Sequence, residues 1–156
     1  MLLRTAPQPT RAERLLNATK LHEILRIALD DLKVVEKDPR YVINMHNWHN
    51  AAKSSGACEV CLAGATLAVS MQVPTSSDRF PGHSALPEGM AQKLYALNAL
   101  RRGEVDLAQS LLCGGAEWAP DFDDLISMKS GTPKFGAPNW WQFMERMHRD
   151  LVEADI

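Results

Sequence analysis

The chain has 156 residues, of which 46% are hydrophobic and 23% are charged, a composition typical of one soluble globular domain. Its 17 basic and 19 acidic residues give a formal net charge of -2, so no basic excess indicates nucleic-acid binding, and no apolar run reaches the roughly 20 residues that span a bilayer. The three cysteines are an odd number, and the start of the chain does not read as a secretory signal, so we expect a cytoplasmic protein without a disulfide framework.

The N-terminal part predicts an arm followed by a helix. Residues 1–10 contain two prolines and predict a flexible arm, while residues 11–156 predict a single helical domain. From residue 12 onward the pattern turns helical, and apolar residues at helical spacing from Leu21 to Val35 predict an amphipathic helix. Asn17 or Thr19 is its candidate cap, and it should end before Pro39, since the residue before a proline disfavours helix. The next segment, 41–45, is short and predicts either an extended stretch or a helical turn.

The segment around Cys58 and Cys61 predicts a buried central helix. Ser55 is a candidate N-cap, and the residues from about 57 to 71 are apolar nearly all round. A helix of this kind is normally enclosed by the core. We expect it to end before Pro74, because a proline disrupts the interior of a helix.

A long loop and further helices follow. Residues 72–87 are rich in Pro, Ser and Gly and predict a loop, in which Arg79 and Phe80 are candidate partner-binding residues. Helices are predicted over 88–102, 104–113 and 119–129, and a last one begins after Asn139. Its first residues, Trp140 and Trp141, point about 100° apart on a helix, so we expect one in the core and the other at an interface or under the long loop.

These elements together predict an all-α fold. We expect one compact domain of five or six helices around the helix at 57–71. The alternative is a short β-hairpin that pairs residues 40–46 with residues 72–80.

Two histidines and two cysteines raise the question of a metal site. His46, His49, Cys58 and Cys61 form H-x2-H-x8-C-x2-C, and two His with two Cys would complete the tetrahedron that structural zinc prefers. The spacer of eight is shorter than in common zinc fingers, and free cysteine is among the most buried residue types. We therefore favour core packing over zinc, and zinc over a redox pair or a Cys–His nucleophile.

The same region carries a resemblance to known proteins. Trp48, then C-x-x-C-L-A-G-A from Cys58 to Ala65, resembles a loose group of small uncharacterised proteins of tailed phages and prophages; the matching residues are Trp48, Cys58, Cys61, Leu62, Ala63, Gly64 and Ala65. The resemblance implies a phage or prophage accessory protein acting in the bacterial cytoplasm, and it assigns no catalytic residue.

The sequence thus favours a non-enzymatic protein that binds a host protein or dimerises, without a cofactor, a nucleic acid or a membrane as partner. The candidate partner-binding residues are Trp140, Trp141, Arg79 and Phe80. The alternatives are a small zinc-stabilised binding module that uses His46, His49, Cys58 and Cys61, and a Cys-dependent enzyme.

Overall fold

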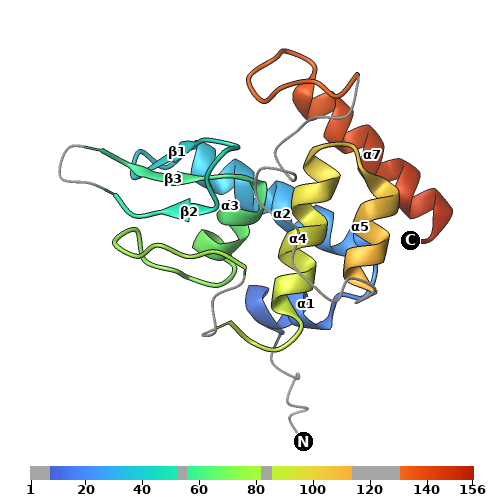
Figure 1. Ribbon diagram of the computed structural model, residues 1–156, viewed down its shortest axis with the longest axis horizontal. Coiled ribbons are helices and arrows are strands. Elements are labelled where there is room, and N and C mark those ends of the chain that lie inside the picture. Colours follow the sequence, from blue (N-terminus) through green and yellow to red (C-terminus); the bar gives the residue numbers. More distant parts are fainter. Residues whose placement is uncertain (1–7, 53–55, 82–85, 114–130) are drawn as a thin grey trace, which may run out of the picture.

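The computed structural model describes residues 8–52, 56–81, 86–113 and 131–156, and in them six helices accompany a three-stranded sheet (Figure 1). The predicted all-α fold is therefore wrong, and the protein is mixed α/β. The elements are α1 (Arg11–Asn17), α2 (Leu21–Glu36), β1 (Tyr41–Ile43), β2 (His49–Asn50), β3 (Cys58–Val60), α3 (Leu62–Val69), α4 (Met90–Arg101), α5 (Val105–Leu112) and α7 (Trp140–Ala154).

The sheet has β3 in the middle, parallel to β1 and antiparallel to β2. Residues 41–43 are extended, as one reading of the sequence allowed, but the predicted hairpin between residues 40–46 and 72–80 is absent from the described residues, because β1 pairs with β3. Residues 72–80 contribute only an isolated bridge, between Arg79 and His49. The sheet lies at one end of the molecule, beside α2 and α3 (Figure 1).

The predicted helix over residues 57–71 is wrong over residues 57–61, because α3 begins only at Leu62. Cys58 lies on β3, where its side chain and that of Val60 are buried on one face while Glu59 is half-buried on the other. Cys61 is the N-cap of α3, and its Sγ accepts a hydrogen bond from the backbone N–H of Gly64 at 3.3 Å. The remainder, α3, is enclosed by the core as expected, with seven of its eight residues buried.

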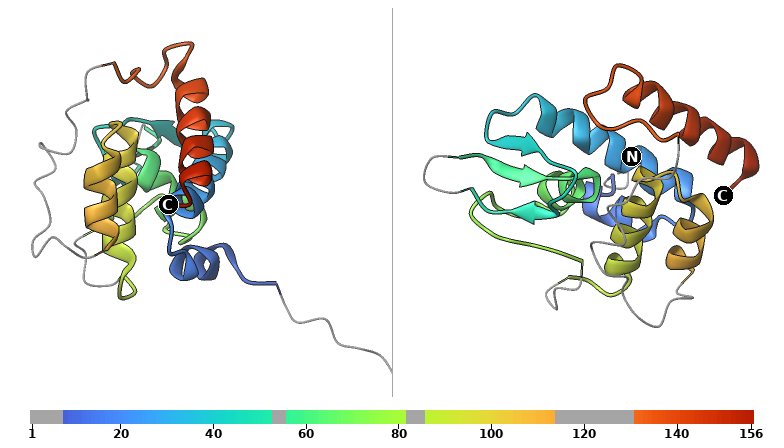
Figure 2. Two further views of the ribbon diagram at one scale, coloured as in Figure 1. Left: turned by 90° about the vertical axis from the view of Figure 1, so that its right-hand side faces the viewer. Right: turned by 45° about the horizontal axis from the view of Figure 1, so that its top comes forward.

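Helix α2 organises the rest of the core. The predicted amphipathic helix is confirmed as α2, although its N-cap is Lys20 and not Asn17 or Thr19. The helical residues before it form the separate helix α1, whose C-cap is Ala18. Helix α2 contacts α1, α3, α4, α5, α7 and β1, and Figure 2 shows α4 and α5 side by side with α7 running along α2. The predicted helices at 88–102 and 104–113 are confirmed as α4 and α5. The predicted helix at 119–129 and the first seven residues of the predicted arm lie outside the described residues.

The C-terminal helix begins directly after Asn139, where the sequence predicts its start, although Asn139 makes no side-chain capping bond. No helix in the described parts of the chain combines the length and apolar character needed to cross a membrane.

Candidate functional site

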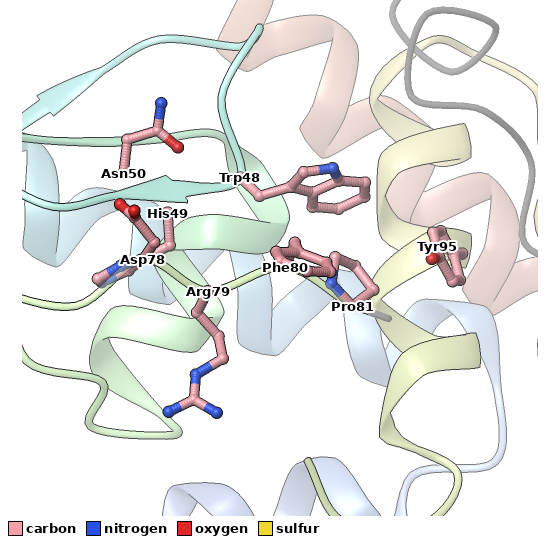
Figure 3. A pocket seen from close by; sticks show the side chains of 8 residues that line it. All are labelled: Trp48, His49, Asn50, Asp78, Arg79, Phe80, Pro81 and Tyr95. Carbon is pink, nitrogen blue, oxygen red and sulfur yellow. The ribbon is translucent and has the colours of Figure 1, made fainter. Parts of the chain in front are cut away.

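A cavity of about 300 Å³ opens between β2, residues 78–81 and α4, and we call it the Trp48 cavity (Figure 3). Apolar rings form much of its wall, and polar side chains stand beside them. The lining residues are Trp48, His49, Asn50, Asp78, Arg79, Phe80, Pro81 and Tyr95.

The rings of the Trp48 cavity come from three separate segments. Trp48, directly before β2, meets Tyr95 of α4 edge to face, with ring centroids 5.9 Å apart. Phe80 lies near them in Figure 3 and is 51% exposed, whereas Trp48 is buried. An exposed phenylalanine beside two other rings is an apolar surface that a partner can cover.

Backbone hydrogen bonds hold residues 75–80 alongside β2. The N–H of Arg79 donates to the carbonyl of His49 at 2.9 Å, and the N–H of Ala52 donates to the carbonyl of Thr75 at 2.8 Å. The carboxylate of Asp78 accepts from the N–H of Ala51 at 2.7 Å. The loop that carries Arg79 and Phe80 is therefore tied to the sheet at this point.

The position of Trp48 depends on a close approach between its backbone and α3. A Cβ added at Gly64 would lie 1.5 Å from the carbonyl oxygen of Trp48, so only glycine fits. The same carbonyl accepts from the N–H of Cys61 at 3.4 Å. The tryptophan, the second cysteine and the glycine of the C-x-x-C-L-A-G-A pattern thus form one packed unit behind the Trp48 cavity.

His49, which lines the same cavity, forms a buried pair with Cys58. The Sγ of Cys58 lies 3.6 Å from Nε2 of His49, and Nδ1 of His49 donates to the carbonyl of Ser77 at 2.8 Å. Burial raises the pKa of the Cys58 thiol to about 11, helped by the charges of Asp78 and Glu59, and burial lowers the pKa of His49. Both shifts favour a neutral thiol beside a neutral imidazole, the opposite of the thiolate–imidazolium pair that a cysteine nucleophile needs.

The four predicted zinc ligands do not form one cluster. His49 and Cys58 are in contact, but Cys61 caps α3 and His46 lies on an exposed turn after β1. In the described ranges, no group of three or more His, Cys, Asp or Glu side chains could hold a metal ion.

The four candidate partner-binding residues lie in two places. Arg79 and Phe80 both line the Trp48 cavity. Trp140 and Trp141 contact each other at the start of α7, with ring centroids 5.0 Å apart. The expectation that one of the two is buried is confirmed by Trp140, which is 1% exposed. Trp141 is half-buried, with Nζ of Lys33 at 5.6 Å from its ring centroid.

Sequence reasoning missed part of the cavity wall. Tyr95 falls within the predicted helix at 88–102, and nothing in the sequence marks it, Pro81 or Asn50 as part of a site. Only the resemblance drew attention to Trp48. The usable signal in the sequence was Gly64, since a glycine within an apolar helix usually indicates close packing, and the group packed against it is the backbone of Trp48.

Comparisons of the chain with protein-family models, with curated proteins and with solved structures found no match. The function therefore has to be argued from the geometry of the chain itself.

Proposed function

We propose that the protein is a non-enzymatic binding protein whose Trp48 cavity takes up one apolar side chain of a partner protein. The observation that carries this proposal is the half-exposed ring of Phe80 beside the edge-to-face pair of Trp48 and Tyr95. Aromatic residues and arginine are the types that dominate binding energy at protein interfaces, and Arg79 lines the same cavity.

The size of the cavity favours a side chain as its occupant. Sites for small-molecule ligands span roughly 300 to 1,000 Å³, and the Trp48 cavity, at about 300 Å³, lies at the lower end of that range. A large apolar side chain with its flanking backbone fits within such a space, and Asn50 and Asp78 beside the rings offer polar contacts to that backbone.

The chemistry of the cavity wall argues against an enzyme. The only thiol and imidazole in contact within the described residues, Cys58 and His49, are both buried and both favour their neutral forms. A structural role, packing within and against the sheet, explains the presence of Cys58 and His49 without any catalytic reaction.

The resemblance of Trp48 and residues 58–65 to phage proteins supports a phage or prophage accessory protein in the bacterial cytoplasm, with a host protein as the partner. The charge of -2 gives no support to a nucleic-acid partner.

The test is a selection of random displayed peptides on the immobilised full-length chain. We expect the selected peptides to share one large apolar residue, and Phe80→Ala to weaken their binding roughly ten-fold or more, because truncating an interface aromatic costs about 1 to 2 kcal/mol or more. The matched control is Val152→Ala, which shortens another exposed apolar side chain, 46% exposed on α7 and outside the cavity.

The proposal fails if no peptide is enriched, or if the enriched peptides bind Phe80→Ala as well as they bind the parent chain. If the chain forms a homodimer that dissociates in the Phe80→Ala variant, the partner at the Trp48 cavity is a second copy of this chain and not a host protein.

A further inference from the structure

A groove of about 380 Å³ runs along α7 on the side that faces the start of α5, and we call it the α7 groove. Most of its lining is apolar, and one charged residue of each sign lines it as well. The apolar lining includes Phe143, Met147, Leu151 and Ile156, and the charged lining consists of Arg146 and Asp150. The α7 groove shares no lining residue with the Trp48 cavity, so the two sites are separate.

The groove exists because the core covers only part of the apolar surface of α7. Among the described elements, α7 packs mainly on α2, and in the left view of Figure 2 it stands in front of α2 with α4 and α5 to its left. Met144 and Leu151 are buried, whereas Phe143 is half-buried and Ala154 is exposed. An apolar strip therefore continues along α7 beyond the core, and an apolar helix face rimmed by charged residues is typical of a protein–protein contact.

Two charges of opposite sign stand at the edge of the α7 groove. Arg146 and Asp150 are both exposed, and because they are four residues apart they lie about one turn from each other on the same face of α7. On α2, Arg26 and Asp30 have the same spacing and form an ion pair at 3.0 Å. Within the described residues no ion pair includes Arg146 or Asp150, so both charges are open to a partner.

This arrangement of charges fits a second copy of the same chain. When two identical helices cross antiparallel about a two-fold axis, a residue before the axis in one copy faces a residue after the axis in the other. Arg146 and Asp150 lie in the middle of the stretch of α7 that lines the groove, residues 143–154, so an axis between them lets each arginine meet the aspartate of the other copy. The same axis brings Phe143 of one copy toward Ala154 of the other, which covers the apolar strip at both ends.

We propose that the α7 groove is the interface of a homodimer, in which two α7 helices lie antiparallel and Arg146 of each copy pairs with Asp150 of the other. The formal net charge of -2 leaves little overall repulsion between two copies. A foreign partner would have to supply the same pattern of charges and apolar side chains in reverse, whereas a second copy already has this pattern. The dimer is independent of the partner site proposed at the Trp48 cavity.

The test is sedimentation velocity of the full-length chain over about 1 to 200 µM, a range that covers the micromolar association expected of a small interface. We expect the parent chain to become dimeric within this range. Arg146→Glu and Asp150→Arg should each weaken the dimer about ten-fold or more, because each variant sets like charges opposite one another twice in its dimer. Circular dichroism shows whether both variants keep the fold of the parent.

Mixing the two variants separates a lost contact from a lost fold. In a one-to-one mixture, a copy with Arg146→Glu and a copy with Asp150→Arg place opposite charges at both contacts, so we expect a dimer of nearly the parent's affinity. A loss of folding cannot produce this rescue. Arg149→Glu and Glu153→Arg are the matched controls, since both residues are exposed on α7 and neither lines the groove, and each variant should dimerise as the parent does.

Four results overturn the proposal. They are a parent chain that stays monomeric up to about 200 µM, single variants that dimerise as well as the parent, a mixture of the two that stays monomeric, and controls that weaken the dimer as much as the groove variants do. Phe80→Ala should leave this dimer intact, and its dissociation by that change would place the interface at the Trp48 cavity and not at the α7 groove.

Discussion

At the scale of single residues, Gly64 is the position where the packing leaves least room. An alanine Cβ there would lie 1.5 Å from the Trp48 carbonyl oxygen and 2.7 Å from its carbon, so the backbone of Trp48 or the start of α3 would have to move. We expect Gly64→Ala to lower the free energy of unfolding by about 3 kcal/mol or more, at or beyond the upper end of the usual cost of overpacking, because backbone atoms cannot swing aside as a side chain does. Urea unfolding followed by circular dichroism measures this loss.

Gly56→Ala is the control for this substitution. A Cβ at Gly56 meets no atom within 4 Å, and its φ is not in the left-handed region, so the change should stay within about 1 kcal/mol and favour the folded state if anything. Equal losses at the two glycines would show that the contact of Gly64 with Trp48 does not limit stability.

At the scale of elements, one lysine of α4 contributes to the attachment of α1 to the core. Lys93 is 9% exposed, and its Nζ donates to the carbonyl of Leu15 at 2.7 Å and to the carbonyl of Leu16, both near the C-terminal end of α1. A cation at the C-terminal end of a helix pairs with carbonyls that have no partner within the helix.

We therefore expect Lys93→Met, which keeps most of the aliphatic stem, to cost about 1 to 3 kcal/mol, the usual range for leaving buried polar groups without partners. The loss should be local: amide hydrogen exchange in α1 should quicken more than exchange in α5. Lys37→Met, at an exposed site, should change neither. Equal quickening in α1 and α5 would mean that Lys93 supports the whole core and not the docking of α1.

The helices and strands also show how much of the fold could be predicted from the sequence. Helices α2, α4 and α5 were predictable because each carries its own apolar spacing or its own breaking residues, such as Pro39 and Gly103. Strand β3 was not, because Cys58–Val60 continues directly into an apolar helix, and its extended form comes from pairing with β1 and β2. Periodicity cannot separate three buried strand residues from a buried helical turn.

The same limit applies to the candidate site. Arg79 and Phe80, which the sequence offers as partner-binding residues, both line the Trp48 cavity, and their part in binding stays a prediction. Tyr95 reaches this cavity only because α4 packs against α3 and the sheet end, a tertiary contact that no local pattern records. The zinc interpretation rested on spacing in the sequence, and the fold brings together only His49 and Cys58 of the four residues, because Cys61 caps α3 and His46 lies on a turn after β1.

At the scale of the whole molecule, Asp31 joins three segments of the chain. It lies on α2 and is 1% exposed, it accepts from Arg11 of α1 at 2.7 Å, and it accepts from Ser70 at the end of α3 at 2.5 Å. Burial raises the pKa of Asp31 to about 6, although Ser70 and Arg11 oppose the rise. The charged form of this carboxyl is therefore less favourable in the folded protein than in the unfolded chain.

The sign of the resulting pH dependence follows from proton binding. Between the ordinary pKa of 3.8 and a folded value of about 6, the folded state binds more protons than the unfolded state, so the contribution of Asp31 to stability is fully present below pH 3.8 and is lost as the pH rises through about 6. One pKa unit corresponds to about 1.4 kcal/mol, so the loss is of the order of 2 to 3 kcal/mol.

Other carboxyls, such as Glu145 with its lowered pKa, push the stability of the whole chain the opposite way, so the measurement has to be a difference. The free energy of unfolding of the parent chain minus that of Asp31→Asn should fall between pH 4 and pH 7, because asparagine keeps the size of the side chain and does not titrate. A difference that rises with pH for Asp31→Asn would mean that Arg11 and Ser70 outweigh burial, and Asp31 would then hold the three segments together as a charged group and not as a neutral one.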